Sequence, residues 1–225
     1  MKSVRVWTGI DERVSLSLGR SMRHWPTPTS TPPGLCVRRR LSGGGAVLRG
    51  PRLLRASVRL PRGHGVLGAG PATAARWFGQ LHLRWLRRMG VPLAHCHEGP
   101  ALEHWSCFAG RSCGEVLLGQ RKIVGIAQAW RRDVVLIHSG TLLSDVPWAL
   151  MADALGRNSP RELRDLHAST VGVQRCVGPI LSQAWAASLA TELEDALHTA
   201  GASQSLHGAV LTGFSHALPA HSACP

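Results

Sequence analysis

The sequence predicts an α+β fold. Short apolar segments joined by Gly- and Pro-rich turns occupy most of the first two thirds of the chain, and segments with helical periodicity dominate the last third. The chain has 225 residues, of which 44% are hydrophobic, so it is long enough to bury a sizeable core. We therefore expect one domain over residues 1–201, followed by a weakly structured tail over residues 202–225.

The N-terminal part of the chain predicts two short strands and a loop. Residues 4–7 and 14–18 are apolar segments of strand length, and Gly9 and Asp11 between them indicate a turn. Residues 24–34 contain four Pro and are predicted to form a loop.

The middle of the chain predicts a strand and a long helix. Residues 55–60 form a strand candidate, and the Gly- and Pro-rich residues 61–71 form a connection. Residues 72–89 are predicted to be helical because apolar side chains recur on one face, and Gly90 is placed to stop the helix. The apolar face consists of Ala74, Trp77, Phe78, Leu81 and Trp85.

Three further strands are predicted before the helical C-terminal third. They comprise residues 115–118, 122–127 and 134–137, and the turn at Gly119 and Gln120 makes the first two a hairpin.

Two helices are predicted after these strands. Ser159-Pro160-Arg161-Glu162 has the form of a capping box, with Pro at the first helical position. Ser182 is a candidate cap of a second helix that ends near Gly201. The apolar side of that helix consists of Trp185, Leu189, Leu193 and Leu197.

The positive charge of the chain is unevenly distributed. The net charge is +13, and 15 Arg but no acidic residue lie between Glu12 and Glu98, whereas residues 113–225 carry 8 basic and 9 acidic residues. A one-sided positive field favours a polyanion or an acidic protein as partner, although a compositional bias towards Arg would produce the same charge. Nucleic acid is not expected as a partner, because the sequence shows no zinc-finger spacing, basic zipper or RNA-binding aromatic signature.

Composition also bears on the compartment. No apolar run approaches the roughly 18 residues of a membrane span, so no membrane association is expected. The N-terminus lacks the long apolar core of a signal peptide, and the six Cys are scattered along the chain. Reduced thiols in the cytoplasm are the simplest interpretation.

Two patterns suggest a site for a negatively charged or carbonyl group. Lys122 is the only Lys besides Lys2 in a chain with 24 Arg. Either this Lys has survived by chance, or it has a task that needs a compact ammonium group. Gly43, Gly44 and Gly45 follow an Arg triplet that ends at Arg40, and such a loop is either a flexible turn or a cradle of main-chain N–H groups.

Cys, His and metal chemistry leave further alternatives open. Cys107 lies in a loop of small residues and is either an inert thiol or a nucleophile activated by a nearby cation. His138 follows an apolar strand and is either a core or rim His or part of a site. The His and Cys residues between positions 95 and 113 match no standard zinc spacing, so no metal site is predicted.

Taken together, these patterns resemble one family. The sequence is similar to the lipoate–protein ligase A and cysteine-dependent octanoyltransferase family, which is related to biotin–protein ligases, over about residues 4–200. The similar segments follow the family's order: residues 14–20 with Ser-Leu-Gly-Arg, 38–47 with Arg-Arg and Ser-Gly-Gly-Gly-Ala-Val, 107–116 from Cys-Phe to Glu-Val, 121–128 with Arg-Lys-Ile-Val-Gly, and 138–143 with His and Thr-Leu-Leu.

The resemblance implies a fold and a site. The implied fold is a mixed β-sheet flanked by helices, of the biotin/lipoate protein ligase catalytic-domain type. In that family the Gly loop surrounds the acyl group, and a Lys ammonium stabilises the charge that develops on its carbonyl. Lys122 and Cys107 are the implied catalytic residues. The implied acyl- or acyl-adenylate-binding residues are Arg40, Ser42, Gly43, Gly44, Gly45, Ala46, Gly125, Ala127 and His138.

The sequence also departs from the family's pattern. The usual helix before the first strand is expected to be missing, and no accessory domain is expected. Arg49 stands where the ligases usually carry His, and Ile126 stands where they carry Ser. These departures bear on ATP use and on activity itself.

Three hypotheses follow from the resemblance. The first is a ligase that uses ATP and Mg²⁺ to attach lipoate or octanoate through an acyl-adenylate. The second is a transferase without cofactor that takes the acyl group from acyl carrier protein onto Cys107. The third is a catalytically weak module that binds an acyl ligand or a carrier. The implied acceptor is a lysine on an acidic lipoyl-carrier domain of a 2-oxoacid dehydrogenase or of the glycine cleavage H protein.

Overall fold

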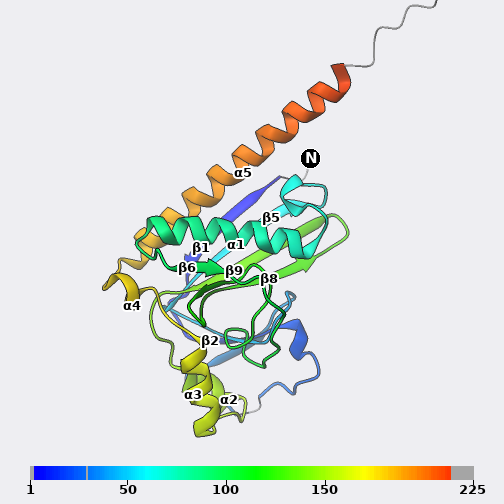
Figure 1. The fold of residues 1–225 in the computed structure, drawn as a ribbon. Helices are drawn as coiled ribbons and strands as arrows, with labels where there is room; N and C mark the ends of the chain where they lie inside the picture. Colours follow the sequence, from blue (N-terminus) through cyan, green and yellow to red (C-terminus); the bar gives the residue numbers. More distant parts are fainter. Residues whose placement is uncertain (1–2, 29, 214–225) are drawn as a thin grey trace, which may run out of the picture.

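The computed structural model describes residues 3–28 and 30–213 and arranges them around two β-sheets (Figure 1). The larger sheet has the strand order β1-β5-β9-β8-β7-β6, and every neighbouring pair is antiparallel. Its strands are β1 (Arg5–Ile10), β5 (Leu53–Pro61), β6 (Ala94–Cys96), β7 (Val116–Leu118), β8 (Arg121–Trp130) and β9 (Val134–Leu142).

The smaller sheet contains three strands in the order β3-β2-β4. They are β2 (Ser15–Leu18), β3 (Cys36–Arg39) and β4 (Ala46–Arg49). β2 pairs in parallel with β3 and antiparallel with β4, so this sheet is the mixed one. The prediction of an α+β fold with a mixed sheet and flanking helices is therefore confirmed.

Helices cover the outer sides of the two sheets. α1 (Pro71–Arg88) and α5 (Ser182–Gly213) pack on one face of the larger sheet, and α2 (Trp148–Ala154) and α3 (Pro160–Ser169) lie at the end of the molecule that holds the smaller sheet (Figure 1). The remaining short elements are η1 (Arg20–Met22), η2 (Gly65–Leu67) and α4 (Gln174–Val177).

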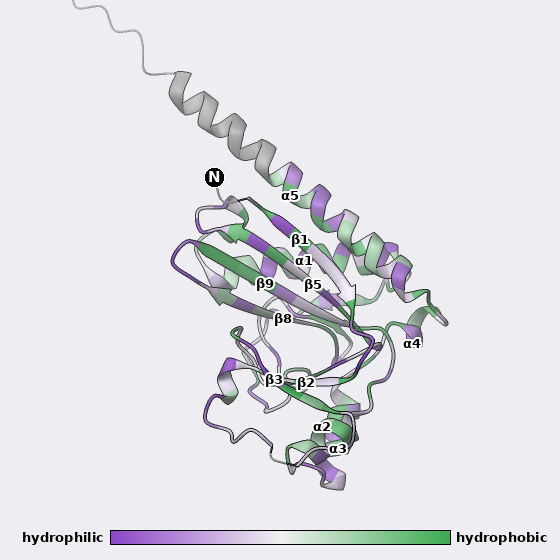
Figure 2. Cartoon of the chain, turned by 180° about the vertical axis from the view of Figure 1, so that it is seen from behind, coloured by the Kyte–Doolittle hydropathy of each residue, from purple (hydrophilic) through white to green (hydrophobic). Residues whose placement is uncertain are grey.

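Two hydrophobic cores result from this arrangement. The first lies between the larger sheet and the pair α1 and α5, where Phe78, Trp85 and Leu189 are fully buried. The second joins the smaller sheet to α2 and α3 and includes Leu16 and Trp148. In Figure 2 the strands of both sheets are seen from the opposite side, with apolar and polar segments alternating along them. The second core also includes Leu53 of β5 and Leu142 of β9, so apolar side chains join the two sheets next to the cavity between them.

α1 also fixes the segment that leads into β7. A Cβ atom on Gly79 would lie 1.8 Å from the carbonyl oxygen of Gly114, so the helix contacts this loop directly through its backbone. Since the next residue after Gly114 is Glu115, the close approach holds the start of β7 and this carboxylate in place.

Several local predictions are confirmed. The helix predicted over residues 72–89 is α1, although Trp77 on its apolar face is only half-buried. β7 and β8 form the predicted hairpin. The capping box is present at the start of α3, where the Ser159 hydroxyl accepts a hydrogen bond from the Glu162 N–H at 3.3 Å.

Other predictions are wrong in their details. Gly9 lies inside β1 and not in a turn, and β3, β4, β6 and α2 were not predicted. The final helix does not end near Gly201, because α5 continues to Gly213. Residues 214–225, the rest of the predicted tail, lie outside the described residues, and the division into one domain and a tail stays a prediction.

No helix in the described part of the chain combines the length and the hydropathy that crossing a membrane requires.

Candidate active site

Arg40 fastens the Gly-rich loop to the end of β2. Its guanidinium donates hydrogen bonds to the carbonyl oxygens of Ser17, Gly43 and Gly45 at 2.7, 3.0 and 2.8 Å. Burial lowers the pKa of Arg40, an effect that Cys107 opposes and Arg49 reinforces. The third residue of the Arg triplet therefore shapes the loop through main-chain contacts.

The Gly-rich loop lies against the segment that carries Cys107. A Cβ atom on Gly45 would lie 2.1 Å from the carbonyl oxygen of Trp105, so only Gly permits this approach. Two main-chain hydrogen bonds join the segments, from Ala46 N to Trp105 O at 2.7 Å and from Cys107 N to Ala46 O at 2.9 Å. Non-local backbone contacts thus place the loop beside the thiol.

The Cys107 thiol is half-buried in a mixed electrostatic environment. Burial raises its pKa above the ordinary value of 9.0, and the Glu115 carboxylate raises it further. Lys122, Arg40 and a hydrogen bond from the Gly45 N–H act in the opposite direction. The resting side chain is therefore a thiol, next to two cations and a main-chain donor that favour its ionised form.

Lys122 and Glu115 form a buried ion pair directly behind Cys107. The Lys122 Nζ lies 2.6 Å from Glu115 Oε2, and the two residues are 1% and 2% exposed. The same ammonium donates a hydrogen bond to the carbonyl oxygen of Cys107 at 2.7 Å. Burial raises the pKa of Glu115, although Lys122 opposes this shift.

Main-chain donors complete the surroundings of this carboxylate. Glu115 accepts hydrogen bonds from the N–H groups of Ser112 at 2.7 Å and Ile126 at 3.2 Å. The pair is thus satisfied on several sides, which is the condition under which buried charges are tolerated.

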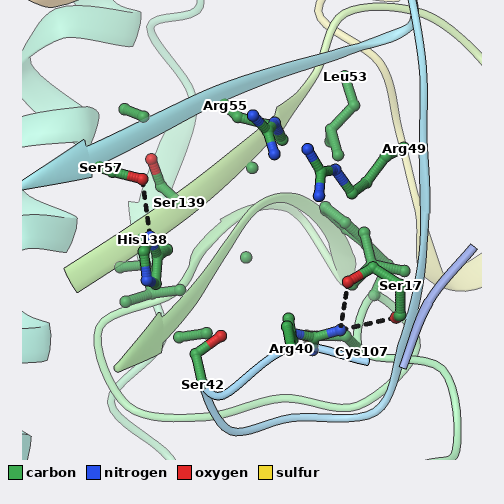
Figure 3. A pocket seen from close by; sticks show the side chains of 17 residues that line it. Ser17, Arg40, Ser42, Arg49, Leu53, Arg55, Ser57, Cys107, His138 and Ser139 are labelled. Carbon is green, nitrogen blue, oxygen red and sulfur yellow. Dashed lines mark hydrogen bonds between the residues drawn. The ribbon is translucent and has the colours of Figure 1, made fainter. Parts of the chain in front are cut away.

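Two cavities meet at Cys107. The smaller, of 180 Å³, lies between β5, β8, β9 and the smaller sheet, and Figure 3 shows its side chains. The larger, of 850 Å³, is lined by Gly43, Gly44 and Gly45 of the Gly-rich loop. Cys107, Ile126 and Ala127 line both.

The predicted site residues divide between these cavities. The smaller is lined by Arg40, Ser42, Cys107, Gly125, Ala127 and His138, and the larger by Gly43, Gly44, Gly45, Cys107, Lys122 and Ala127. Ala46 lines neither, because its side chain is buried in the second core and only its backbone joins the loop to Cys107. The functional roles of all these predicted site residues stay predictions.

His138 belongs to the wall of the smaller cavity. Its Nδ1 lies 2.7 Å from the Ser57 hydroxyl (Figure 3). Burial lowers the pKa of His138, and Arg40 and Arg49 lower it further. His138 is therefore an uncharged hydrogen-bonding group at this site.

Four residues of the site were not predicted as functional: Glu115, Arg49, Arg55 and Ser57. A signal existed for Arg55 and Ser57, because alternate residues of a strand share a face and the strand itself was predicted. For Glu115, an acid placed directly before three apolar residues was the available signal. Arg49 was visible as a departure from the family's pattern, but its contacts were not.

The described residues contain no group of three or more His, Cys, Asp or Glu side chains that could hold a metal ion. Cys36, Cys96, Cys107, Cys113 and Cys176 are all free thiols in this part of the chain, and Cys224 lies outside it.

Comparison with known proteins decides the family. The model of the family described as "Lipoyl protein ligase A/B catalytic domain" matches residues 15–195. This range includes both cavities and all the predicted site residues. The chain belongs to this family. The resemblance seen in the sequence is therefore confirmed, and the family is one of enzymes that attach lipoyl or octanoyl groups.

Individual relatives agree with the family. Octanoyltransferase LipM of Moorella thermoacetica is 33% identical over 115 residues, which are 49% of this chain and 42% of that protein, so the match spans less than half of the relative. Lipoate-protein ligase A bound with ATP has the same fold, with a TM-score of 0.61 and 18% identity over 88% of this chain and 74% of that one. Protein Ta0514 of T. acidophilum with bound lipoic acid also has this fold, with a TM-score of 0.60. It is 18% identical, and the match covers 88% of this chain and 73% of that one.

Proposed function

We propose that this protein transfers an octanoyl or lipoyl group to a lysine of a lipoyl-carrier domain through a thioester on Cys107. The observation that carries the proposal is the position of the Cys107 sulfur. It lies where the two cavities meet, accepts a hydrogen bond from the Gly45 N–H and has the Lys122 ammonium behind its own carbonyl group. A thiol in that position reaches an acyl chain on one side and a second substrate on the other.

The chemistry needs two exchanges at one carbonyl carbon. In the first, the Cys107 thiolate attacks the thioester of the donor, a new S–C bond forms, and the donor leaves as a thiol that takes up the proton lost by Cys107. In the second, the amine of the carrier lysine attacks the acyl-enzyme, the amide forms, and the proton released by the amine returns to the Cys107 sulfur. The cations near Cys107 stabilise its thiolate.

The charge distribution supports acidic partners. The excess of Arg before residue 98 provides a positive field that attracts acidic carrier proteins, both the lipoyl-carrier domain and acyl carrier protein as donor. A T. acidophilum lipoate protein ligase of similar fold was described together with its E2 lipoyl domain. Because the proposed nucleophile must stay reduced, the proposal places the protein in the cytoplasm.

An acyl-adenylate ligase is the second candidate. The larger cavity favours it, because its 850 Å³ and its lining by the three Gly provide room for a nucleotide. The fit to ATP and Mg²⁺ is incomplete, however. The Lys122 ammonium that would meet a phosphate is already neutralised by Glu115 at 2.6 Å, and the N–H of Gly43 is bonded to the carbonyl oxygen of Gln128. This is why the thioester route ranks first.

Intact-protein mass spectrometry after incubation with octanoyl-acyl carrier protein, without ATP, tests the proposal. We expect an octanoyl adduct that hydroxylamine removes, that is lost in Cys107→Ala and that persists in the matched control Cys36→Ala, which changes an exposed Cys. An adduct that survives in Cys107→Ala would refute the route. If no adduct forms but lipoate and ATP modify a lipoyl domain, the ligase is correct. If neither reaction occurs, the chain is a binding module.

A further inference from the structure

The β7–β8 hairpin contains a β-bulge at Ile123. The strand register shifts between Val116 and Leu117, so β8 has one more residue than β7 at this point. Lys122 and Gly125 both border a cavity, although residues three positions apart in a regular strand face opposite sides of the sheet. The bulge therefore turns the Lys122 side chain to the side of the sheet that carries the site.

The Lys122 ammonium links a carboxylate to the main chain of the proposed nucleophile. Its Nζ lies 2.6 Å from Glu115 Oε2 and donates a hydrogen bond to the carbonyl oxygen of Cys107 at 2.7 Å. Two of its three N–H groups are thus engaged. Because only 1% of Lys122 is exposed, water does not compete for these contacts. The place of the ammonium, and with it the anchoring of Cys107, therefore depends on Glu115.

Glu115 is held through its backbone and through both carboxylate oxygens. Its Oε2 accepts a hydrogen bond from the Ser112 N–H at 2.7 Å, and its Oε1 accepts one from the Ile126 N–H at 3.2 Å. Its carbonyl oxygen accepts a further bond from the His97 N–H at 2.8 Å. Since a Lys side chain is a flexible stem, the fixed carboxylate determines where the ammonium lies, and not the reverse.

The electrostatics of Cys107 depend on the same pair. Burial raises the pKa of the thiol, Lys122 lowers it and Glu115 raises it again, whereas Arg40 and the Gly45 N–H lower it. The other Arg, Glu and His residues that line the two cavities are Arg49, Arg55, Glu103, His104, Arg111 and His138. Lys122 and Glu115 therefore oppose each other at the sulfur, and loss of the carboxylate would leave the cation to act alone.

We propose that Glu115 is a positioning residue for the nucleophile and that it acts through Lys122. It fixes the ammonium at the carbonyl oxygen of Cys107, which keeps Cys107 in place between the two cavities. It also balances the cation that would otherwise act on the sulfur alone. The inference rests on the proposed function, in which Cys107 is the nucleophile. Glu115 takes part in no bond change, and a ligand in either cavity does not need to reach it.

Nitrogen NMR of the wild-type protein tests the position of the ammonium without a substitution at the site. Lys2 and Lys122 are the only Lys residues of the chain, so lysine labelled with ¹⁵N at its ε-amino group gives two side-chain signals, which Lys2→Arg assigns. We expect a Lys122 ammonium signal that is protected from exchange with water near neutral pH, because the group is buried and bonded. A Lys122 signal lost to rapid exchange would overturn the proposal, because the ammonium is then not held.

Glu115→Gln keeps the length of the side chain and removes its charge. Because Glu115 raises the pKa of Cys107, this change lowers that pKa. We expect alkylation of Cys107 by iodoacetamide near neutral pH to become about threefold faster or more. Peptide mass spectrometry reads Cys107 separately from the other Cys residues, and circular dichroism checks that the variant is folded. Unchanged or slower alkylation would refute the balancing of charge by Glu115.

Glu115→Asp is the complementary change, because it keeps the charge and withdraws the carboxylate by one methylene group. Alkylation of Cys107 is expected to stay within about twofold of wild type. The kcat of octanoyl transfer to a lipoyl domain should fall by about tenfold, because a shifted ammonium no longer anchors Cys107. KM for the lipoyl domain should not change, since Glu115 contacts neither substrate. Faster alkylation in both variants would indicate a loosened structure and overturn the assignment, as would a wild-type kcat in Glu115→Asp.

Glu98→Gln is the matched control for these variants. Glu98 is exposed, pairs with Arg76 at 3.1 Å and lines neither cavity, so its loss should change neither alkylation nor transfer.

Failure of this inference and failure of the proposed function are distinguishable. If no octanoyl adduct forms on the wild-type protein, the thioester route fails, whereas the Lys122 signal and the alkylation rates still decide the role of Glu115. If the adduct forms but the Lys122 signal is not protected, the role of Glu115 alone is refuted.

Discussion

Two neighbouring residues of β9 show how differently the two faces of the larger sheet are used. His138 faces the smaller cavity and pairs with the Ser57 hydroxyl at 2.7 Å. Ser139 faces the first core, and its hydroxyl pairs with His82 of α1 at 2.8 Å. Both are His–Ser hydrogen bonds between side chains far apart in the sequence, yet their surroundings are opposite.

In the core-face pair His82 is completely enclosed, whereas Ser139 also borders the smaller cavity. His82 has no exposed surface, its Nδ1 lies 2.8 Å from the carbonyl oxygen of Phe78, and burial lowers its pKa to about 4. The cavity-face pair borders open space beside Arg40 and Arg49. The difference teaches that hydrogen bonding alone does not identify a functional His. What distinguishes His138 from His82 is the cavity that it lines and the nearby charges of Arg40 and Arg49. We therefore expect core-face changes to affect stability and cavity-face changes to affect ligand binding.

The Lys122–Glu115 pair is the strongest challenge to that division, because it lies on the cavity side but is fully buried. Lys122→Met leaves the Glu115 carboxylate buried without its partner, and we expect the free energy of unfolding to fall by about 3–5 kcal/mol near neutral pH. The loss should shrink at low pH, because Glu115 then takes up a proton and the unpaired charge disappears. Urea unfolding at several pH values measures this.

The matched control for this prediction removes both charges. Lys122→Met with Glu115→Gln leaves neither ion unpaired and should recover most of the lost stability without restoring acyl transfer. A single variant that is as stable as the wild type would show that the ion pair is not buried in solution.

The His82–Ser139 pair provides the second prediction, on acid stability. Because the pKa of His82 is about 4 in the folded chain and 6.5 for an ordinary His, the unfolded state binds the proton first as the pH falls. The free energy of unfolding should therefore decrease by about 3 kcal/mol between these two pKa values. His82→Leu with Ser139→Ala removes the titrating group and its partner together, and its unfolding should lack this decrease.

The cavity-face pair is the control for the acid experiment. His138→Leu with Ser57→Ala removes a His whose pKa is also lowered, so the sign of its effect is the same. Since His138 is only partly buried, we expect a smaller change in acid stability, together with weaker ligand binding. If the two double variants behave alike, the two faces of β9 do not differ as proposed.

The sequence predicted the features that depend on local interactions and missed those that depend on contacts between distant segments. α1, the β7–β8 hairpin and the cap at Ser159 depend on neighbouring residues, and all three were predicted correctly. The smaller sheet was missed because the parallel pairing of β2 with β3 brings together segments separated by the long Pro-rich loop. Only the folded chain shows that pairing.

The site shows the same limit. Lys122 and Cys107 were singled out by residue type and by resemblance, because an isolated Lys and a Cys in a small-residue loop are visible in the sequence. The contact between Lys122 and Glu115, and the sharing of Asp11 by two Arg, depend on side chains from different strands. No spacing rule could have predicted them. α5 was predicted too short because Gly normally disfavours a helix by only about 1 kcal/mol, which a long helix tolerates.

The smallest expected effect concerns the ionisation of Cys107. It again compares a group at the cavity with a group in the first core. Burial keeps both Cys107 and His82 uncharged, but only the thiol must ionise for the proposed chemistry. In a variant that retains Cys107 as its sole Cys, alkylation by iodoacetamide should rise roughly tenfold per pH unit between about pH 7 and about pH 9, because the pKa lies above that range. Mass spectrometry of the labelled protein measures the rate. A plateau already near neutral pH would mean that Lys122, Arg40 and the Gly45 N–H outweigh burial, and the thiolate would then be the resting state of the enzyme.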